Sequence, residues 1–572
     1  MRRIRPSDPG WPDTASWEKL KQAVGGRLIK VEPLFASCEN GASASCDDVL
    51  AALKNPYYVG DQPAGTQTVG WVDAWTSAPS AYAVAATTAE DVAAAVNFAR
   101  ANKLRLVVKG GGHSYQGTSD SADSLLIWTR AMNGVVLHDA FVAQGCAGKV
   151  APQPAVTLGA GVVWMHAYDA VTTRAHRYVQ GGGCATVGVA GLIQSGGFGS
   201  FSKNYGTAAG GLLEAEVVTA DGQTRIANAC TNPELFWGIK GGGGGSIGVV
   251  TKITLRTREL PALFGGVRLN IKATSDAAFR RVVARFTEFC AESLLNRQCG
   301  ETVTFGTDNT VAVAMVFQGL DQTQAGSIWQ SLTDWVAASP DDFTMIAPLA
   351  IKTSAAYNWW NVEYLRTSTL HGQAFFDTRP GASANNAWFA EENTELGIFL
   401  HGFQSLWLPA SLLEEKQRGR FADALFAATR HRDVQLHFNK GLAGSADEDV
   451  AAARDTAMNP AALTAFALAL VAGGVAPAYK NLLTGPPDLS SARRDAAAIA
   501  AAGDELRKVV PDAGSYVSES DFFERNWQTA FWGVNYARLR EVKRNYDPDG
   551  LFFVHHGVGS EDWSADGFTR LI

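Results

Sequence analysis

The sequence has little charge, no basic run and no long apolar run. Charged residues make up 18% of the 572 residues, and the formal net charge is −7. Because no run of lysine and arginine is long enough to form a basic stripe, nucleic acid is not an expected partner. The longest apolar stretch, 461–476, is interrupted by Gly473 and Gly474 and is shorter than the ~18 residues that a membrane-spanning helix needs. We therefore expect no membrane segment.

The N-terminus lacks the apolar core of a secretory leader. Residues 1–13, MRRIRPSDPGWPD, contain paired arginines, but no apolar run follows them. We expect the mature form of a secreted or periplasmic protein, with a cytoplasmic enzyme as the alternative.

Cysteine is scarce and its number is odd. The chain has seven cysteines, so if one has a chemical role, six remain for disulfides. Two pairs are close enough in the sequence to close small loops, and the remaining two cysteines would form a long-range pair. The alternative is seven reduced thiols in a cytosolic enzyme. The pairs would be Cys38–Cys46, Cys290–Cys299 and Cys146–Cys230, although six cysteines allow 15 pairings and the sequence does not choose among them.

The chain is long enough for more than one hydrophobic core. Single cores stop growing at about 250–300 residues, and 46% of this sequence is hydrophobic. Changes of pattern divide it into 1–264, 265–510 and 511–572. The first part alternates strands with helices and holds the concentrated glycine. The second part mixes alternating strands with alanine-rich amphipathic helices, which indicates a separate lobe.

Several local patterns predict particular elements. Residues 80–108 read as strand, helix and strand, with Thr88 as the helix N-cap. The run 302–319, TVTFGTDNTVAVAMVFQG, predicts a hairpin that turns at Asp308 and Asn309. Residues 527–546 predict one long helix, which the turn DPDG ends.

The segment DVQLHFNKG, 433–441, alternates between apolar and polar residues. A strand with this pattern places His437 and Asn439 on one polar face. That face either looks into a cleft, where both side chains would contact a substrate, or is an ordinary solvent-facing surface.

Three glycine clusters, at 110–112, 181–199 and 241–245, indicate close approach of the backbone to a ligand. None fits a familiar nucleotide motif. KGGGHSYQGTS, 109–119, lacks the Gly-Lys-Ser/Thr ending of a phosphate-binding P-loop, and GVAGLIQSGGFG does not stand in a strand–GxGxxG–helix unit. No CxxC or HExxH pattern accompanies His113, His176 or Cys184, so we expect no metal.

These segments together resemble the berberine bridge enzyme-like oxidases, flavoproteins of the vanillyl-alcohol oxidase type. The resemblance rests on VVKGGGHSYQGTS, GGGCATVGVAGLIQSGGFGSFSKNYG, LLEAEVVTADG, ELFWGIKGGGGGSIGVVTKI and FWGVNYARLREVKRNYDPDGLFF. It implies an α+β fold in which 1–264 forms an FAD-binding domain of the PCMH type, with a core at about 75–260. It also implies an antiparallel-sheet substrate domain at 265–510 and a C-terminal segment, 511–572, that returns to the FAD domain.

The resemblance also implies how the FAD is held. His113 would bond the C8α methyl group of the flavin, and Cys184 would bond its C6 position. Two bonds hold the cofactor without a closing lid and raise its tendency to accept electrons. Val187, three residues after the cysteine, corresponds to a position that admits O₂ when small. The further expected FAD contacts are Gly110, Gly111, Gly112, Ser114, Tyr115, Gly117, Thr186, Val187, Gly188, Gly191, Gly196, Gly197, Gly199, Tyr205, Gly248 and Val249.

The candidate catalytic residues lie near the C-terminus. SYVSESDFFE, 515–524, matches the family segment that carries such residues, and it places Tyr516 and Glu519 there, although Ser518 and Glu519 replace an Asn-Tyr pair found in plant relatives. Farther on, VHHGVGSEDW supplies His555 and His556, which would titrate near neutral pH. A surface role for the glutamate and a turn-anchoring role for the histidines are the alternatives.

The expected activity is that of an oxidase. It would transfer hydride from an alcohol carbon of a sugar, a small alcohol or a secondary metabolite to flavin N5, and O₂ would become H₂O₂. Trp359 and Tyr364 in YNWWNVEYL would stack on such a substrate, with the apolar core as their alternative place. Oxidative ring closure, dehydrogenation, and a dehydrogenase with another electron acceptor are the alternative activities. A flavin-loaded binding protein without turnover is the alternative from another class.

Overall fold

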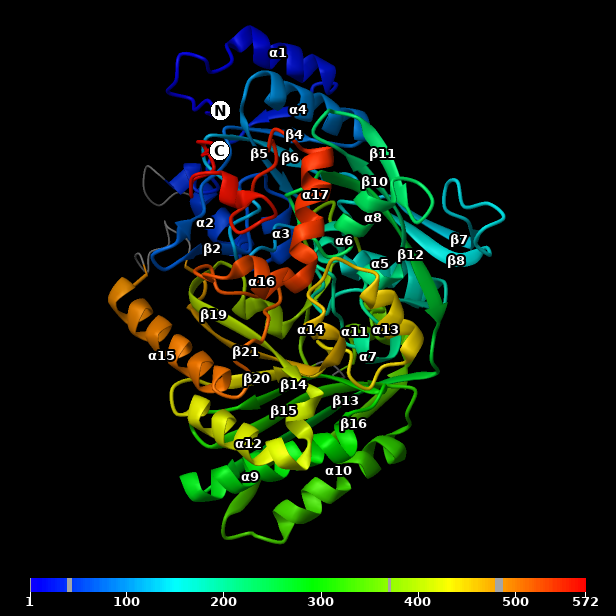
Figure 1. Cartoon of the computed structure of the whole chain (residues 1–572), viewed down its shortest axis with the longest axis vertical. Helices are drawn as coiled ribbons and strands as arrows, with labels where there is room; N and C mark the ends of the chain where they lie inside the picture. Colours follow the sequence, from blue (N-terminus) through cyan, green and yellow to red (C-terminus); the bar gives the residue numbers. More distant parts are fainter. Residues whose placement is uncertain (1, 39–43, 369–371, 479–486, 572) are drawn as a thin grey trace.

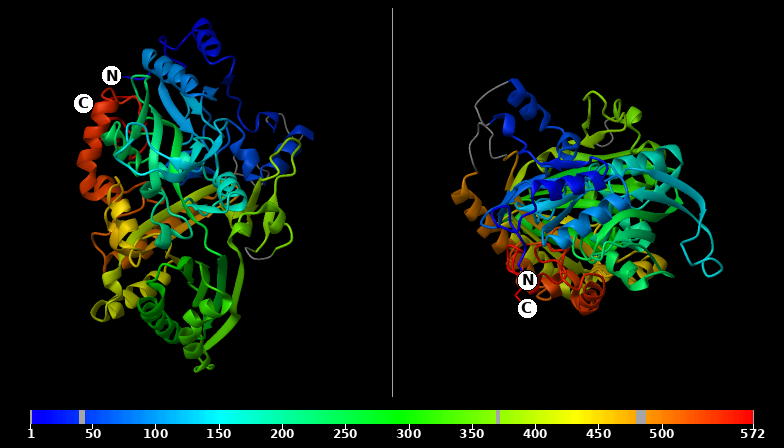
Figure 2. Two further views of the ribbon diagram at one scale, coloured as in Figure 1. Left: turned by 90° about the vertical axis from the view of Figure 1, so that its right-hand side faces the viewer. Right: turned by 90° about the horizontal axis from the view of Figure 1, so that it is seen from above.

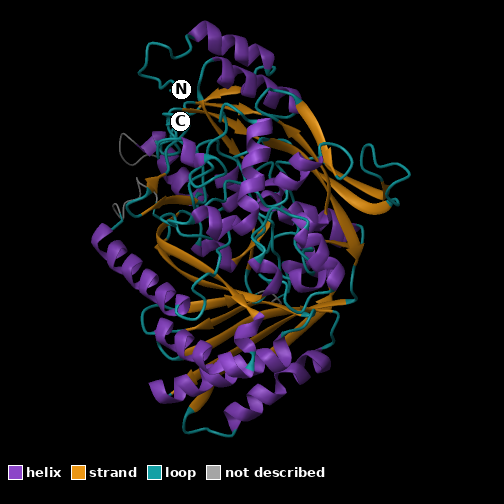
Figure 3. Cartoon of the chain, viewed as in Figure 1, coloured by secondary structure: helices purple, strands orange, loops and turns teal. Residues whose placement is uncertain are grey.

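The described residues form three large β-sheets, a small sheet of β17 (Ala374–Phe376) and β18 (Ala387–Phe389), and the helices around them (Figure 3). The computed structural model describes residues 2–38, 44–368, 372–478 and 487–571. The two smaller main sheets lie toward one end of the long axis, and the largest sheet crosses toward the other end (Figure 1). The two termini lie side by side, because Arg3 N donates a hydrogen bond of 2.8 Å to Phe568 O (Figure 2).

The first sheet contains the predicted strand–helix–strand unit. Helix α4 (Ala89–Ala101) begins with a capping box, in which the Thr88 side chain accepts from Asp91 N and the Asp91 side chain accepts from the N-cap backbone. β4 (Tyr82–Ala85), β6 (Ser124–Trp128) and β5 (Arg105–Lys109) run parallel, and β1 (Leu28–Lys30) pairs antiparallel with β4. The order across the sheet is β1, β4, β6 and β5.

The second sheet is antiparallel and encloses the central core. Helices α5 (Trp164–Tyr168), α6 (Val189–Gln194) and α8 (Pro233–Ile239) contribute buried side chains to the same hydrophobic cluster. The loop between β7 and β8 projects from the body of the molecule (Figure 2). The order is β11 (Thr224–Asn228), β10 (Leu212–Val218), β12 (Val249–Glu259), β8 (Gln153–Gly159) and β7 (Val135–Phe141), with β9 (Arg177–Val179) pairing with β12.

The third sheet is the largest and contains the predicted hairpin, with its turn at Asp308 and Asn309. It extends beyond 265–510, because β2 and β3 from the N-terminal part join it beside β19. The order is β16 (Phe343–Ala355), β13 (Leu263–Ala273), β15 (Thr310–Gln318), β14 (Cys299–Phe305), β20 (Val434–His437), β21 (Ala465–Val475), β19 (Ile398–Pro409), β2 (Thr68–Trp71) and β3 (Trp75–Thr76).

Long helices cover one face of this third sheet (Figure 1). Their apolar sides and the sheet share one buried cluster. The alternating segment 433–441 has one apolar and one polar face. Val434, Leu436 and Phe438 belong to the buried cluster, and the polar side chains of the segment face the other way. The helices are α9 (Asp276–Phe289), α10 (Gln322–Ala337), α12 (Glu415–Thr429) and α15 (Leu489–Arg507).

The C-terminal segment forms two helices where one was predicted. α16 (Trp527–Trp532) and α17 (Tyr536–Tyr546) are separated at Gly533, whose φ of +55° lies in the left-handed region that glycine adopts readily. From α17, the buried Lys543 amine donates 2.6 and 2.8 Å hydrogen bonds to Ser246 O and Phe552 O. The end of the chain is thereby fixed against the third glycine cluster.

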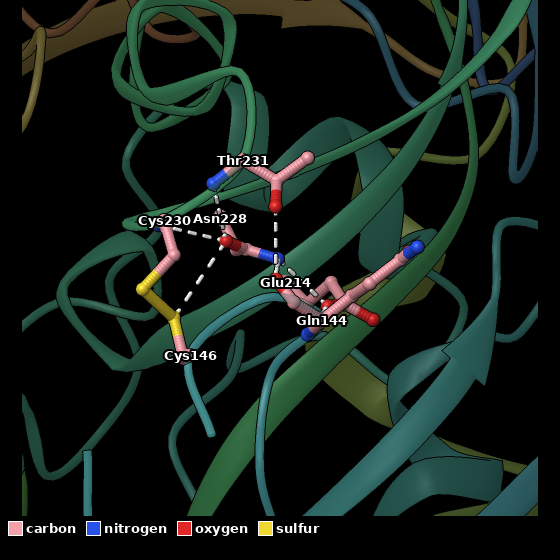
Figure 4. Close-up of a disulfide and its surroundings, with 6 residues drawn as sticks. All are labelled: Gln144, Cys146, Glu214, Asn228, Cys230 and Thr231. Carbon is pink, nitrogen blue, oxygen red and sulfur yellow. Dashed lines mark hydrogen bonds between the residues drawn. A yellow bond between two sulfur atoms is a disulfide. The ribbon is translucent and has the colours of Figure 1, made fainter. Parts of the chain in front are cut away.

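Two of the three predicted disulfides are present, Cys38–Cys46 and Cys146–Cys230. Beside the second, Asn228 accepts 2.8 Å hydrogen bonds from the backbone N–H groups of Cys230 and Thr231 (Figure 4).

The predicted Cys290–Cys299 disulfide is wrong. Both residues are free thiols, buried as small apolar side chains in the cluster under the third sheet. Closeness in sequence does not provide the Cβ geometry that a disulfide needs.

Two further features are absent from the described ranges. Within them, no helix is both long and apolar enough to cross a membrane. Among those same residues, no group of three or more His, Cys, Asp or Glu side chains is placed to hold a metal ion.

Candidate active site

A cavity of about 650 Å³ lies on the face of the third sheet opposite the long helices. Residues 110–119, 182–198 and 243–250 contribute to one wall, so all three glycine clusters reach it. The opposite wall comes from β14, β19, β20 and β21, and the C-terminal segment adds 516–519 and 554–557. Its size lies within the range of about 300–1,000 Å³ that is usual for ligand and cofactor sites.

Two of the glycine loops touch each other directly. A Cβ on Gly111 would lie only 2.8 Å from both Gly188 N and Thr186 O. Since real Cβ atoms do not approach backbone this closely, the contact requires glycine. The first loop directly follows β5. Its contact with the second loop brings His113 close to the loop that carries Cys184.

His113 and Cys184 both line this cavity. His113 Nε2 lies 2.8 Å from Oγ1 of Thr186, two residues after the cysteine. Burial lowers the pKa of His113 to about 4, with a smaller contribution from Arg130, so its imidazole is neutral near pH 7. Burial also raises the pKa of the Cys184 thiol, and Glu395 and Glu392 raise it further.

Three carboxyl groups and one amine face the cavity near Cys184. The Lys440 amine donates to both oxygens of Glu519, at 2.6 and 2.5 Å. Glu395 accepts a 3.0 Å hydrogen bond from the hydroxyl of Tyr115, and burial raises the pKa of Glu395. Glu301, whose pKa is also raised by burial, accepts a 2.5 Å hydrogen bond from Ser200. We call Glu301, Glu395 and Glu519 with Lys440 the carboxylate group.

His555 and His556 form an aromatic stack at another side of the cavity. His555 lies between Phe522 and His556, with ring centroids 3.8 Å from each, and its Nε2 donates a 2.8 Å hydrogen bond to Phe522 O. Burial lowers the pKa of His556 to about 3, and His555 lowers it further. Both rings are neutral at pH 7, and His556 has a φ of +50°.

Polar atoms in the cavity wall have no partner among the described residues. They are Nε2 of Gln67, Oγ of Ser246 and Oδ1 of Asn439, on residues that are at most 4% exposed, together with Oε1 of Gln116 and Nδ1 of His556. Buried polar atoms without a partner are costly. The wall therefore fits a polar ligand that supplies both hydrogen-bond donors and acceptors, and the glycine backbone beside it fits a phosphate.

The structure brings most predicted site residues to this one cavity. The polar face of β20 is part of its wall, as the cleft-facing interpretation of the alternating segment predicted. The predicted residues that line it are Gly110, Gly111, Gly112, His113, Ser114, Tyr115, Cys184, Val187, Gly188, Gly191, Gly248, His437, Asn439, Tyr516, Glu519, His555 and His556.

Other predicted residues lie outside the cavity lining. Gly199 serves loop packing, since a Cβ there would lie 1.8 Å from Gly181 O. Trp359 is 4% exposed and packs edge-on against Phe264 in the central core. Trp359 thus has the alternative place expected for it, in the apolar core, and Tyr364 lies outside the cavity lining. The predicted residues outside the lining are Gly117, Thr186, Gly196, Gly197, Gly199, Tyr205, Val249, Trp359 and Tyr364.

Sequence reasoning missed four charged residues around Cys184. Lys440 lies within the alternating segment 433–441, directly after Asn439, so the sequence pattern does point to its position. Glu301 lies on β14, and Glu392 and Glu395 lie in or beside the short helix η6 (Ala390–Thr394). No local pattern marks these glutamates, because they meet only through the tertiary fold.

Two segments match known families. Residues 79–228 match the FAD binding domain family, and residues 515–559 match the family described as berberine and berberine like. The FAD-linked oxidoreductase malF of Malbranchea aurantiaca is 30% identical to the chain over 593 residues, which cover 99% of this chain and 93% of that protein.

Solved structures share the whole fold. The VAO-type flavoprotein MtVAO615 of Myceliophthora thermophila C1 superposes with a TM-score of 0.79 at 25% identity, over 100% of both chains. The glucooligosaccharide oxidase of Acremonium strictum, described with a 6-S-cysteinyl, 8α-N1-histidyl FAD, has a TM-score of 0.64 at 19% identity. That match covers 84% of this chain and 92% of that one.

Proposed function

The chain belongs to the FAD-linked oxidoreductases of the vanillyl-alcohol oxidase type with a berberine bridge enzyme-like C-terminal segment, and from this membership we propose an oxidase with doubly attached FAD. The predicted family, fold class and FAD-dependent oxidoreductase activity are confirmed. The proposal adds the two covalent bonds, an alcohol substrate and the product H₂O₂.

In this proposal His113 and Cys184 bond one FAD. The observation that carries it is that both side chains line the same cavity, although they come from different loops. Backbone N–H groups of 110–112 and the hydroxyl of Ser114 would hold the pyrophosphate, and the unpartnered atoms of Gln67 and Ser246 offer further polar contacts. When bound, FAD supplies a two-electron acceptor.

The substrate would enter beside β20, where His437 and Asn439 face the cavity. An alcohol must lose its hydroxyl proton as hydride leaves its carbon, so a proton acceptor has to lie near that hydroxyl. We assign this role to the carboxylate group, with Glu519 as the acceptor and Lys440 holding its carboxylate in place. His556 is a poor proton acceptor, because burial lowers its pKa to about 3.

Val187 supports the choice of O₂ as electron acceptor. Its residue lines the cavity three positions beyond Cys184, and a side chain as small as valine would admit O₂ there. The two disulfides support a secreted or periplasmic location, since such bonds persist in oxidising compartments.

The test combines a colour assay with a substrate panel. The purified protein is precipitated with acid, and retention of yellow flavin in the pellet supports covalent attachment. The native protein is then mixed with sugars, small alcohols and phenolic alcohols while H₂O₂ and carbonyl products are measured. Peroxide formed together with a carbonyl product supports the proposal. Colour released into the supernatant, or a product with a new C–C or C=C bond, contradicts it.

A further inference from the structure

Glu392 connects the two residues that are proposed to bond the flavin. Its side chain is 8% exposed and belongs to η6, far along the chain from both of them. Oε2 accepts a 3.1 Å hydrogen bond from Ala185 N, next to Cys184, and one of 3.5 Å from the hydroxyl of Thr186. Thr186 in turn contacts His113, so one carboxylate is linked to both attachment points.

This chain of contacts selects one tautomer of His113. A threonine hydroxyl has one hydrogen, and Thr186 donates it to Glu392. Its oxygen must then accept from His113, which places the imidazole hydrogen on Nε2. The lone pair of the neutral ring is therefore on Nδ1. That nitrogen is free to act as a nucleophile, as in sites where a base orients a histidine through its second nitrogen.

We propose that Thr186 and Glu392 are positioning residues for the covalent attachment of His113, holding Nδ1 as the nucleophile and accepting the Nε2 proton as the bond forms. The proposal rests on the proposed double attachment of FAD. The new element is a relay of three residues, His113, Thr186 and Glu392. Neither Thr186 nor Glu392 needs to touch the reacting carbon.

The overall step balances with O₂ as the oxidant. His113 Nδ1 forms a bond to the C8α carbon, and one C–H bond of that methyl group breaks. The Nε2–H bond of His113 also breaks, and its proton passes through the Thr186 hydroxyl to Glu392 and then to solvent. In total two protons and two electrons leave, and O₂ takes up two electrons and two protons to become H₂O₂.

The protonation states near neutral pH support this relay. Burial raises the pKa of Glu392 to about 7, against the lowering effect of backbone N–H groups of Phe389, Ala185 and Thr186. A carboxyl with such a pKa accepts and releases protons readily at neutral pH. Burial keeps His113 neutral, with a pKa of about 4, so its Nδ1 lone pair is available.

The experiment separates the two attachments by mass spectrometry. Wild type, Thr186→Val, Thr186→Ser, Glu392→Gln and His113→Ala are purified as full chains after the same time in the presence of FAD. Proteolysis then gives the fraction of the peptide with His113 and of the peptide with Cys184 that carries flavin. Valine matches threonine in shape but has no hydroxyl, whereas serine retains the hydroxyl and is the matched control.

We expect the fraction of His113 with flavin to fall at least tenfold in Thr186→Val and in Glu392→Gln, while Thr186→Ser stays close to wild type. The Cys184 bond is expected to persist in all of them, which shows that each variant folds and holds FAD. Full His113 attachment in Thr186→Val, or equal loss of both bonds, overturns the inference. An unmodified His113 in wild type refutes the proposed function instead.

Discussion

The imidazole Nε2 of His113 lies 2.8 Å from the hydroxyl of Thr186, two residues beyond Cys184. This contact joins two loops that are more than seventy positions apart in the sequence. It is possible because glycines at 111 and 188 allow the two backbones to touch. The expected attachment points of a single flavin are thereby set in one cavity wall.

Removing either attachment point should leave the flavin bound. His113→Ala and Cys184→Ala each retain one bond, so acid precipitation should leave yellow colour in the pellet of both single variants. In the double variant the colour should move to the supernatant. Absorbance of the two fractions measures this, and free flavin from either single variant would argue against two bonds.

The base assignment predicts a large effect of Glu519→Gln. The amide cannot accept the hydroxyl proton, so kcat should fall by about 10²–10⁴-fold, the usual contribution of a general base. Rapid-mixing measurement of flavin bleaching without oxygen isolates this step. Glu524→Gln is the control, since Glu524 belongs to the same segment but lies outside the cavity lining. Equal rates in Glu519→Gln and wild type would remove Glu519 from this role.

The contact between the glycine loops predicts that Gly111→Ala is damaging. The new methyl group would meet Gly188 N and Thr186 O at 2.8 Å and force the loops apart. We expect a loss of stability of about 1–3 kcal/mol, the usual cost of overpacking, together with less bound flavin. Gly134→Ala is the control, because nothing lies within 4 Å of its Cβ position. Thermal unfolding and the flavin-to-protein absorbance ratio measure both effects, and equal behaviour of the two variants would contradict this account.

The cysteine assignments predict how many thiols react in the unfolded protein. In denaturant without a reducing agent, a thiol reagent should label Cys290 and Cys299, because both are free. Cys184 should not react if its sulfur bonds the flavin. Mass spectrometry of the labelled peptides identifies the sites. Labelling at Cys146 or Cys230 would show that their disulfide does not form, and labelling at Cys184 would show that its flavin bond is missing.

The raised pKa of Glu392 predicts that the difference in stability between wild type and Glu392→Gln depends on pH. Its folded-state pKa, about 7, is above the ordinary value of 4.5, so its contribution to stability is fully present below about 4.5 and is lost as the pH rises through 7. Glu392→Gln lacks this titration. The melting temperature of wild type relative to the variant should therefore decline across this range. Glu395, Cys184 and Tyr57 also interact electrostatically with Glu392. A pH-independent difference would show that Glu392 does not titrate in this range.

The sequence predicted elements whose signals are local. The capping box at Thr88, the hairpin turning at Asp308 and the alternating face of β20 follow from neighbouring residues alone. The resemblance supplied His113 and Cys184. Glu392, Glu395 and Glu301 could not be predicted, because separate segments bring them to Cys184 only after folding. The Cys290–Cys299 pairing failed because it relied on spacing alone, and spacing does not fix the side-chain geometry that a disulfide needs.

One measurement tests the central claim most directly, namely the mass of the flavin-containing fragments after proteolysis of the native holoenzyme. If a single isoalloxazine ring bonds both side chains, the peptide with His113 and the peptide with Cys184 will elute as one yellow species. Its mass will equal both peptides plus one FAD, less the hydrogens lost in forming two bonds. Recovery of the two peptides separately and without flavin would contradict the account.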